Sequence, residues 1–216
     1  MSCRPSCDLR RELARLRGSA LLQAGGYGIY RGLVEPGWLA AMLAEAMSGE
    51  KRIDQVVDAA DVEQVRGGAP AREVVCVEGG PVQDELFASA PLQQFVANQV
   101  GLPLQPCGAR ASYSIYTGPQ SHLDIHRDVS GCDIALVTCL RDSHPFAGDG
   151  AVDLWLDDLT TPLSEIRSYT EHGRSRLALA PGDSMLIHGG LIPHRIPKPG
   201  INRMRVVSLM CFEIVQ

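Results

Sequence analysis

The sequence predicts a mainly β fold with flanking helices (α+β), in which an antiparallel barrel or jelly roll has the helices on its outside. Three observations support this class. Helical patterns come first in the chain, short strand-like runs follow one another from position 110 onward, and turns such as "GPQ", "AGDG", "APGD" and "KPG" separate most of these runs. The strand-like runs are "RASYSIYTG", "DIALVTCL", "AVDLWLDD", "SRLALA", "DSMLIHG" and "RMRVVSLMCFEIV", with a longer insertion at 157–173.

The N-terminal half shows helical and strand-like patterns in turn. Leucine spacing predicts a short amphipathic helix over 9–20 with Asp8 as its N-cap, followed by a glycine-punctuated strand, "GGYGIYRGLVE". A proline at its start and a glycine at its end delimit a helix over 36–49, and another helix is expected near 91–100. The polar, weakly periodic region 50–73 is expected to be a mobile or substrate-facing segment.

The composition excludes several classes of protein. The 216 residues suffice for one domain with a real core, and 45% hydrophobic with 21% charged residues argues against wholesale disorder. The formal charge of −5 gives no sign of the basic surface that grips phosphate backbones, so we expect no nucleic acid partner. No stretch approaches the roughly 18 apolar residues of a membrane span, and the N-terminus lacks the apolar segment of a signal peptide, so we expect no membrane association.

Cysteine usage bears on the redox compartment. The number of cysteines is odd, they are scattered, and no CxxC motif occurs. They are Cys3, Cys7, Cys76, Cys107, Cys132, Cys139 and Cys211. This usage predicts reduced thiols in a cytoplasmic protein. For Cys3 and Cys7 we favour a frayed terminus over a metal or redox pair.

Two histidine–aspartate pairs with metal-ligand spacing lie within "YTGPQSHLDIHRDVSG": His122 with Asp124, and His126 with Asp128. The letters "HRD" also occur in protein-kinase catalytic loops, where an asparagine stands five residues after the aspartate. Here that position is Asp133, and the kinase glycine-rich loop, strand lysine and DFG motif are all missing from the sequence. We therefore set the kinase interpretation aside in favour of a metal site.

The pattern favours a facial triad. Non-haem Fe(II) oxygenases hold iron with two histidines and one carboxylate, and a histidine and an aspartate two apart on one strand face the same way. The third ligand should then be a histidine on a later strand, with a basic residue on the last strand. His194 lies 68 residues after His126, and Arg203 and Arg205 follow it at nine and eleven residues.

The pieces "YTGPQSHLDIHRD", "APGDSMLIHG", "PHRI" and "NRMRVVSL" resemble the iron(II)/2-oxoglutarate-dependent oxygenases, particularly their prolyl-hydroxylase-like branch. The resemblance covers about residues 110–213. It implies a double-stranded β-helix (jelly roll, cupin-like) that uses Fe(II), the cosubstrate 2-oxoglutarate and dioxygen. We expect a single domain over 1–216, with 1–109 as N-terminal support and substrate region and 110–216 as the jelly-roll core.

The resemblance also favours one of the two pairs. In this family a tyrosine typically sits on the strand before the ligand pair, with a glycine turn between them. Tyr116 lies ten residues before His126 and is followed by "TGP". This implies His126, Asp128 and His194 as the catalytic metal ligands, since His122 would have to coordinate from inside the turn. A carboxylate at Asp128, rather than glycine or alanine, favours hydroxylation or desaturation over halogenation.

A basic residue on the last strand is implied to bind the distal carboxylate of 2-oxoglutarate, and an arginine fork suits it because the fork binds bidentately. The nine-residue offset favours Arg203 over Arg205, and Tyr116 is expected to add a hydroxyl hydrogen bond. The sequence departs from the family twice. Many relatives have serine or threonine where this chain has Arg205, and the paired glycines before the middle strand occur only as "GDGAVDLW".

The remaining histidines fit a ligand role less well. With His188 as the distal ligand, the arginines would follow at fifteen and seventeen residues, so we expect His188 near the barrel rim. His144 and His172, beside Pro145 and Gly173, are expected in loops.

Together these inferences predict a 2-oxoglutarate-dependent non-haem iron dioxygenase that hydroxylates or desaturates an unactivated C–H bond. The expected substrate is a small molecule, such as an amino acid or natural-product intermediate. The alternatives are a protein side-chain (prolyl-type) hydroxylase and a cupin-type metal or ligand-binding barrel that uses no 2-oxoglutarate. Binding of 2-oxoglutarate separates the last of these from the others.

Overall fold

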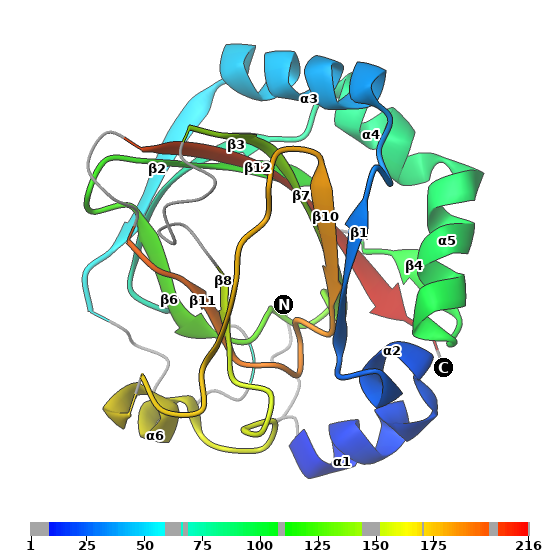
Figure 1. Ribbon diagram of the computed structural model, residues 1–216, viewed down its shortest axis with the longest axis vertical. Coiled ribbons are helices and arrows are strands. Elements are labelled where there is room, and N and C mark those ends of the chain that lie inside the picture. Colours follow the sequence, from blue (N-terminus) through cyan, green and yellow to red (C-terminus); the bar gives the residue numbers. More distant parts are fainter. Residues whose placement is uncertain are drawn as a thin grey trace.

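The computed structural model of the chain describes residues 9–58, 66, 69–107, 111–143, 152–169, 171–198 and 203–215 (Figure 1). Several predictions from the sequence lie outside these residues. They concern Asp8 as an N-cap, the pair Cys3 and Cys7, His144, and the glycines of "GDGAVDLW".

Within the described residues, twelve strands form one antiparallel sheet that curls on itself. Its order is β1-β10-β7-β12-β5-β3-β6-β11-β8-β9, with β2 beside β3 and β4 beside β12. The bounds are β1 Tyr27–Arg31, β2 Lys51–Val56, β3 Arg72–Glu78, β4 Leu104–Pro106, β5 Ser112–Thr117, β6 His122–His126, β7 Ile134–Asp142, β8 Val152–Leu154, β9 Ser175–Leu177, β10 Asp183–Ile187, β11 His194–Ile196 and β12 Met204–Ile214. Because β3 pairs with both β5 and β6, the sheet folds over, and β6, β11 and β8 lie across the barrel from β12 and β7 (Figure 1). The predicted mainly β class and jelly-roll architecture are confirmed.

The helices lie outside the barrel, as predicted (Figure 1). They are α1 Leu9–Arg15, the 3₁₀ helix η1 Leu16–Gly18, α2 Ala20–Gln23, α3 Pro36–Ser48, α4 Pro81–Ala88, α5 Ala90–Val100 and α6 Leu163–Ser168. These bounds confirm the predicted helices over 36–49 and near 91–100. The single helix predicted over 9–20 is confirmed only at its start: α1 ends at Arg15, a 3₁₀ turn follows, and the extended backbone of Ser19 separates both from α2. No helix in the described ranges combines the length and the apolar character that crossing a membrane would take.

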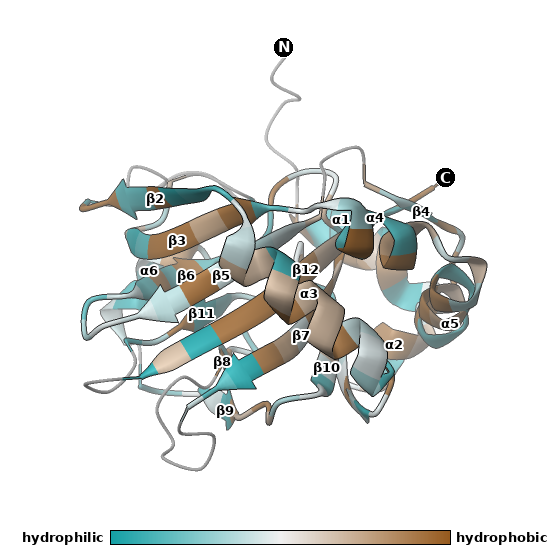
Figure 2. Cartoon of the chain, turned by 90° about the horizontal axis from the view of Figure 1, so that it is seen from above, coloured by the Kyte–Doolittle hydropathy of each residue, from teal (hydrophilic) through white to brown (hydrophobic). Residues whose placement is uncertain are grey.

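Strand alternation divides the apolar residues of the sheet between two cores. Leu136 of β7 and Met210 of β12 face outward and pack with buried residues of α3, α4 and α5, and Figure 2 shows α3 lying across these two strands. Their neighbours Ala135, Val137 and Leu209 face into the barrel and join the inner core. Because side chains of a strand point alternately to its two faces, the same strands serve both cores, and only the inner face can contribute to a site inside the barrel.

Helix α4 was not predicted, because its N-terminus is capped by a residue distant in sequence. Gly80 at the N-cap offers no side chain. The Glu45 carboxylate of α3 accepts hydrogen bonds instead from the backbone N–H groups of Gly80, Val82 and Gln83, at 3.2, 2.8 and 3.1 Å. The Tyr113 hydroxyl donates to the same carboxylate at 2.5 Å. The unpaired N–H groups at the start of a helix donate readily to such a carboxylate, but the local sequence gives no sign of this cap.

The polar region 50–73 was expected to be a mobile or substrate-facing segment, but both of its ends form strands. Lys51–Val56 forms β2, and Arg72 begins β3, with which β2 pairs along its whole length. β2 is an edge strand, and its Ile53 is 70% exposed. An edge strand that is largely solvated lacks the alternation of buried and exposed residues on which strand prediction depends.

The prediction of reduced thiols is wrong for two of the cysteines. Cys132, just before β7, and Cys211 of β12 form a disulfide across 79 residues of sequence. The backbone brings them together because Cys211 is the register partner of Ala135, close to the start of β7. Such a pairing depends on tertiary contacts, which cysteine spacing does not contain. The cytoplasmic location stays a prediction.

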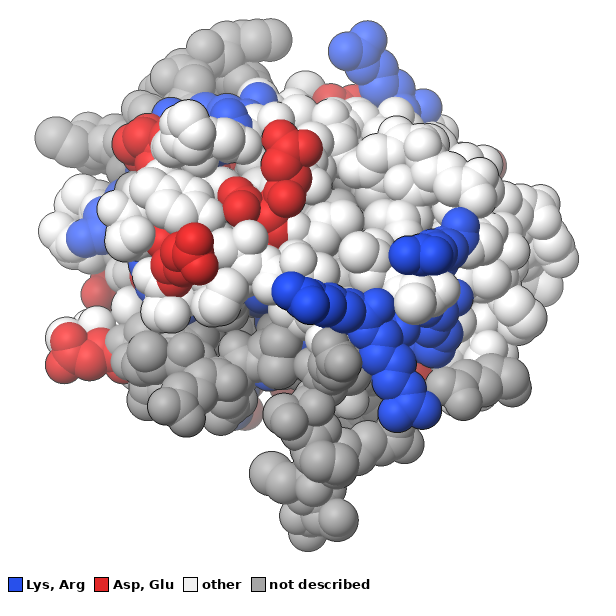
Figure 3. All heavy atoms as spheres, turned by 90° about the horizontal axis from the view of Figure 1, so that it is seen from below, with Lys and Arg blue, Asp and Glu red and all other residues white. Residues whose placement is uncertain are grey.

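Charged side chains on the lower face of the molecule lie in separate groups (Figure 3). Arg10 and Arg11 of α1 and Arg17 of η1 are exposed. Arg15 instead turns inward, to Glu12 at 2.5 Å and Asp133 at 3.7 Å. The first helix is therefore held against the segment that precedes β7.

Candidate metal centre

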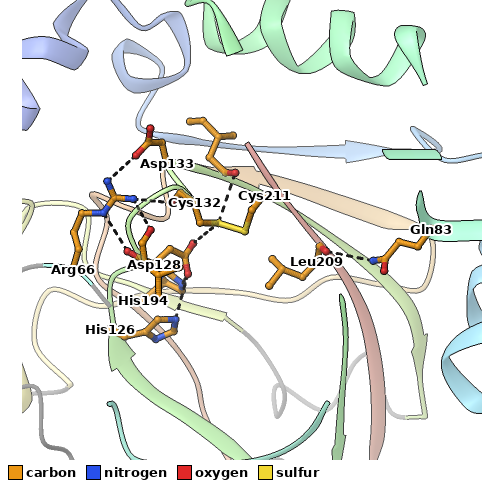
Figure 4. Close-up of a disulfide and its surroundings, with 11 residues drawn as sticks. Arg66, Gln83, His126, Asp128, Cys132, Asp133, His194, Leu209 and Cys211 are labelled. Carbon is orange, nitrogen blue, oxygen red and sulfur yellow. Dashed lines mark hydrogen bonds and ion pairs between the residues drawn. A yellow bond between two sulfur atoms is a disulfide. The ribbon is translucent and has the colours of Figure 1, made fainter. Parts of the chain in front are cut away.

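Two adjacent strands bring the three candidate metal ligands together. His126 is the last residue of β6, His194 is the first residue of β11, and the two are register partners. Asp128 follows two residues after β6 ends, at the start of a segment, residues 128–133, that we call the ligand loop. One ligand atom from each of these three residues lies within 4.8 Å of the others. Figure 4 shows the Asp128 carboxylate directed toward both imidazoles.

The backbone fixes the tautomer of each imidazole. Nδ1 of His126 lies 2.8 Å from the carbonyl oxygen of Asp124, and Nδ1 of His194 lies 2.9 Å from that of Ile192. A carbonyl only accepts, so each Nδ1 carries the proton and each neutral Nε2 keeps a lone pair. Both Nε2 atoms lie 3.6 Å from Oδ1 of Asp128. Two lone pairs and a carboxylate oxygen therefore face one another, which is the donor set that a divalent transition metal takes.

The pKa values of His126, Asp128 and His194 reflect their burial and their closeness to one another. Burial, with the charge of His194, lowers the pKa of His126. Burial also disfavours the imidazolium of His194, but the Asp128 carboxylate outweighs it and raises the pKa of His194. Although burial alone would raise the pKa of Asp128, the two histidines lower it, so the carboxylate stays ionised, as a metal ligand must.

A β-bulge turns the other histidine–aspartate pair away from this centre. His194 pairs with His126, but Ile196, two residues on, pairs with Leu123, three residues back. The extra residue on β6 reverses the alternation, so Leu123 packs with Ile196 in the inner core. Asp124 instead lies 3.6 Å from Arg167 of α6. His122 was expected inside the turn; it begins β6, with Nδ1 2.7 Å from the Gln120 carbonyl oxygen.

Gly189 leaves the space that the Asp128 carboxylate occupies. The backbone N–H of Asp128 donates to the Gly189 carbonyl at 2.8 Å. A Cβ atom at position 189 would lie 1.8 Å from Oδ2 of Asp128, far inside contact distance. Only glycine therefore allows this backbone to run beside the ligand.

We expect Gly189→Ala to weaken metal binding at least about tenfold, because the methyl group displaces the carboxylate from the imidazoles. Titration of the metal-free protein with Co(II) measures this. Gly37→Ala is the matched control, since a Cβ there meets nothing within 4 Å. Unchanged Co(II) affinity in Gly189→Ala would show that Asp128 is not a ligand in this position.

Arg127, which stands between His126 and Asp128 in the sequence, was not predicted as a site residue. It is fully buried, and its side chain donates to four backbone carbonyls: Nε to Leu191 at 2.9 Å, and Nη2 to Asp158, Leu159 and Thr161 at 2.9 to 3.1 Å. Burial lowers the pKa of Arg127 to about 10, which leaves it charged at neutral pH. It ties the end of β6 to the segment before His194. The sequence offered one sign of this role. Arg127 stands between His126 and Asp128, so in an extended chain its side chain points away from the metal centre.

The residues considered for the cosubstrate lie on β5, on β12 and just before β12. Tyr116 and Arg205 are register partners, with 4% and 1% exposure. Burial raises the pKa of Tyr116 to about 12 despite the opposing charge of Arg205, so the phenol stays protonated. Arg203 is buried too, but its Nε and Nη2 donate to the two carboxylate oxygens of Asp142 at 2.9 and 2.5 Å.

His188 differs from the expectation of a rim position. It is fully buried, and its Nε2 lies 2.8 Å from the hydroxyl of Ser19 at the start of α2. Burial lowers the pKa of His188 to about 4. It follows Ile187, whose side chain belongs to the inner core, so alternation directs His188 to the outside of the sheet, away from the metal centre. His172 lies in a turn, as expected.

Comparison with known proteins identifies the architecture. No protein-family model matches the sequence, and no curated protein matches it by sequence. Solved structures do match. HygX from Streptomyces hygroscopicus, solved with nickel and 2-oxoglutarate bound, has a TM-score of 0.65 at 13% identity over 95% of this chain and 87% of its own. The chain has the fold of the Fe(II)/2-oxoglutarate oxygenases.

Two further members of this fold match over most of their length. The non-haem α-ketoglutarate-dependent epimerase SnoN from nogalamycin biosynthesis has a TM-score of 0.60 at 15% identity, over 95% of this chain and 82% of its own. A prolyl-4-hydroxylase from Pseudomonas putida has a TM-score of 0.58 at 16% identity, over 93% and 99%. Nearly the whole described barrel and its helices therefore follow the oxygenase fold.

Proposed function

We propose that this protein is an Fe(II)- and 2-oxoglutarate-dependent dioxygenase that hydroxylates or desaturates an unactivated C–H bond of a small molecule. The convergence of two histidine lone pairs and an ionised aspartate at one point of the barrel carries this proposal. The oxygenase fold supports it, and so does HygX, whose structures hold nickel and 2-oxoglutarate.

In this proposal His126, Asp128 and His194 would hold Fe(II) as a set of two histidines and one carboxylate. When bound, Fe(II) with 2-oxoglutarate and dioxygen supplies the oxidising chemistry, which converts 2-oxoglutarate to succinate and carbon dioxide. The protein's part is to position the reactants and exclude water. Val207 of β12, Val74 of β3 and Tyr116 form a buried apolar cluster.

We propose Arg205, with the Tyr116 hydroxyl, as the anchor for the distal carboxylate of 2-oxoglutarate. This reverses the order that sequence spacing favoured. Arg203 is engaged bidentately by Asp142, which neutralises its charge. Arg205 lies opposite Tyr116 on the neighbouring strand, and its charge opposes the rise in the pKa of Tyr116 that burial causes.

We expect Arg205→Ala to weaken 2-oxoglutarate binding by roughly 30- to 1000-fold, because a charge-assisted bidentate contact is lost from a buried site. Arg203→Ala should weaken it less. The measurement is 2-oxoglutarate affinity of each variant after circular dichroism and metal analysis show it folded and loaded. A larger loss in Arg203→Ala would restore the assignment made from spacing. No loss in either would remove the arginines from the cosubstrate site.

A small-molecule substrate is supported by two structures of the same fold. HygX has been solved with hygromycin B bound, and SnoN with nogalamycin RO. A protein side chain is the second candidate, since prolyl hydroxylases also share the fold, one of them solved with a peptide fragment. Nucleic acid is not proposed as a substrate.

Turnover tests the proposal. Aerobic incubation with Fe(II) and 2-oxoglutarate should release succinate slowly without a prime substrate and faster in the presence of the right one. Mass spectrometry of candidate metabolites and proline-containing peptides would find the product. Absence of 2-oxoglutarate consumption from metal-loaded protein in every mixture would favour the cupin-type alternative.

A further inference from the structure

Arg66 lies against the ligand loop, although it comes from the connection between β2 and β3 (Figure 4). Its side chain is 9% exposed. Nε donates to the backbone carbonyl of Asp128 at 3.2 Å, and Nη2 donates to those of Val129 and Cys132 at 2.8 and 3.0 Å. Nη1 donates to the Asp133 carboxylate at 2.7 Å. One guanidinium therefore cross-links the loop from its first residue to its last.

The backbone beside the loop leaves room for this guanidinium. A Cβ at position 190 would lie 2.3 Å from Nη2 of Arg66. Gly189, the preceding residue, gives space to the Asp128 carboxylate in the same way. Because they lack side chains, Gly189 leaves space for the Asp128 carboxylate and Gly190 leaves space for the Arg66 guanidinium.

The far end of the loop is anchored independently. Oδ2 of Asp133 accepts from the backbone N–H of Ile214 at 2.9 Å, and Cys132 is joined to Cys211, so this end is fixed to β12. The near end, at Asp128, is held by Gly189 and by Arg66. Because the Asp128 carbonyl itself accepts from Arg66, loss of the guanidinium would free the backbone that aims the carboxylate at the imidazoles.

We propose that Arg66 is a positioning residue for the metal ligand Asp128, which sets the placement of the carboxylate through the ligand loop. The inference rests on the proposed function only in taking Asp128 as a metal ligand. Arg66 belongs to the region 50–73, which was expected to be mobile or to face the substrate. In this inference it instead holds a metal ligand in place. Residues that orient metal ligands typically change metal affinity 10- to 100-fold when they are removed.

Co(II) binding to the metal-free protein tests this, with Co(II) alone as the probe and its visible absorption spectrum as a second readout. Arg66→Ala should bind Co(II) roughly 10- to 100-fold more weakly and show a changed spectrum. Arg66→Lys, which keeps the charge but not the fork, should lie between it and wild type. Millimolar guanidinium should restore part of the affinity of Arg66→Ala. Arg72→Ala is the matched control, since Arg72 of β3 pairs with Asp54 of β2 at 2.8 Å, in the strands of the same hairpin.

The outcomes separate this inference from the proposed function. Wild-type affinity and spectrum in both folded Arg66 variants would overturn the positioning role and leave the metal centre intact. A lower melting temperature with an unchanged spectrum and affinity would reduce Arg66 to a structural residue. If Arg66→Ala does not fold, the Co(II) affinity and the visible spectrum of Arg66→Lys decide whether Arg66 has the positioning role. Failure of wild type to bind Co(II) would remove both the centre and the role of Arg66.

Discussion

Replacing His126 or His194 with alanine is expected to lower the affinity for Co(II) or Fe(II) by at least about 100-fold. Each Nε2 supplies one of three protein donors, and removal of a ligand exceeds the 10- to 100-fold cost of disturbing a residue that merely orients one. Anaerobic titration of metal-free protein, with inductively coupled plasma analysis of the loaded samples, measures the effect.

His122→Ala is the matched control. It removes an imidazole four residues from His126 on the same strand, but the bulge directs that ring elsewhere. It should keep metal affinity within about twofold of wild type, because no donor atom is lost. Full occupancy in His126→Ala together with loss in His122→Ala would move the centre to the other histidine–aspartate pair.

The second large effect is expected from the disulfide. Replacing Cys132 and Cys211 together with alanine should lower the free energy of unfolding by about 2–5 kcal/mol, since the bond closes a loop of 79 residues and restricts the unfolded chain. Urea denaturation of the double variant and of wild type measures this. Cys76→Ala, which removes a thiol outside any disulfide, is the control.

Alkylation under denaturing, non-reducing conditions provides an independent check of the bond. Mass spectrometry should find Cys132 and Cys211 unmodified and Cys76 modified. Alkylation of all three, with equal urea midpoints for the double variant and wild type, would contradict the disulfide and support the reduced thiols inferred from composition.

Much of the fold followed from local pattern. The strand runs after position 110 and the helix bounded by Pro36 and Gly49 were predictable because alternation, turn residues and caps are local properties. Helix α4 was missed, because the carboxylate that caps it belongs to Glu45 on another helix. β2 was missed because it is an edge strand. Even an apolar residue such as Ile53 is exposed in it, so the strand lacks the alternation of buried and exposed residues by which strands are predicted.

The candidate site divides in the same way. His126, Asp128 and His194 could be proposed from order and spacing. The bulge that separates them from His122 and Asp124 depends on the pairing of β6 with β11, which no local sequence specifies. Arg66 and Gly189 act through contacts with the ligand loop across long sequence separations, and the ion pair of Arg203 with Asp142 arises in the same way.

Isothermal titration of 2-oxoglutarate into the metal-loaded protein under argon tests whether the chain is a 2-oxoglutarate oxygenase. We expect saturable one-to-one binding when Fe(II), or Ni(II) as an inert substitute, is present. Binding should be lost or much weaker in metal-free protein and in His126→Ala. Absence of 2-oxoglutarate binding to protein that demonstrably holds one metal ion at His126, Asp128 and His194 would contradict the oxygenase assignment.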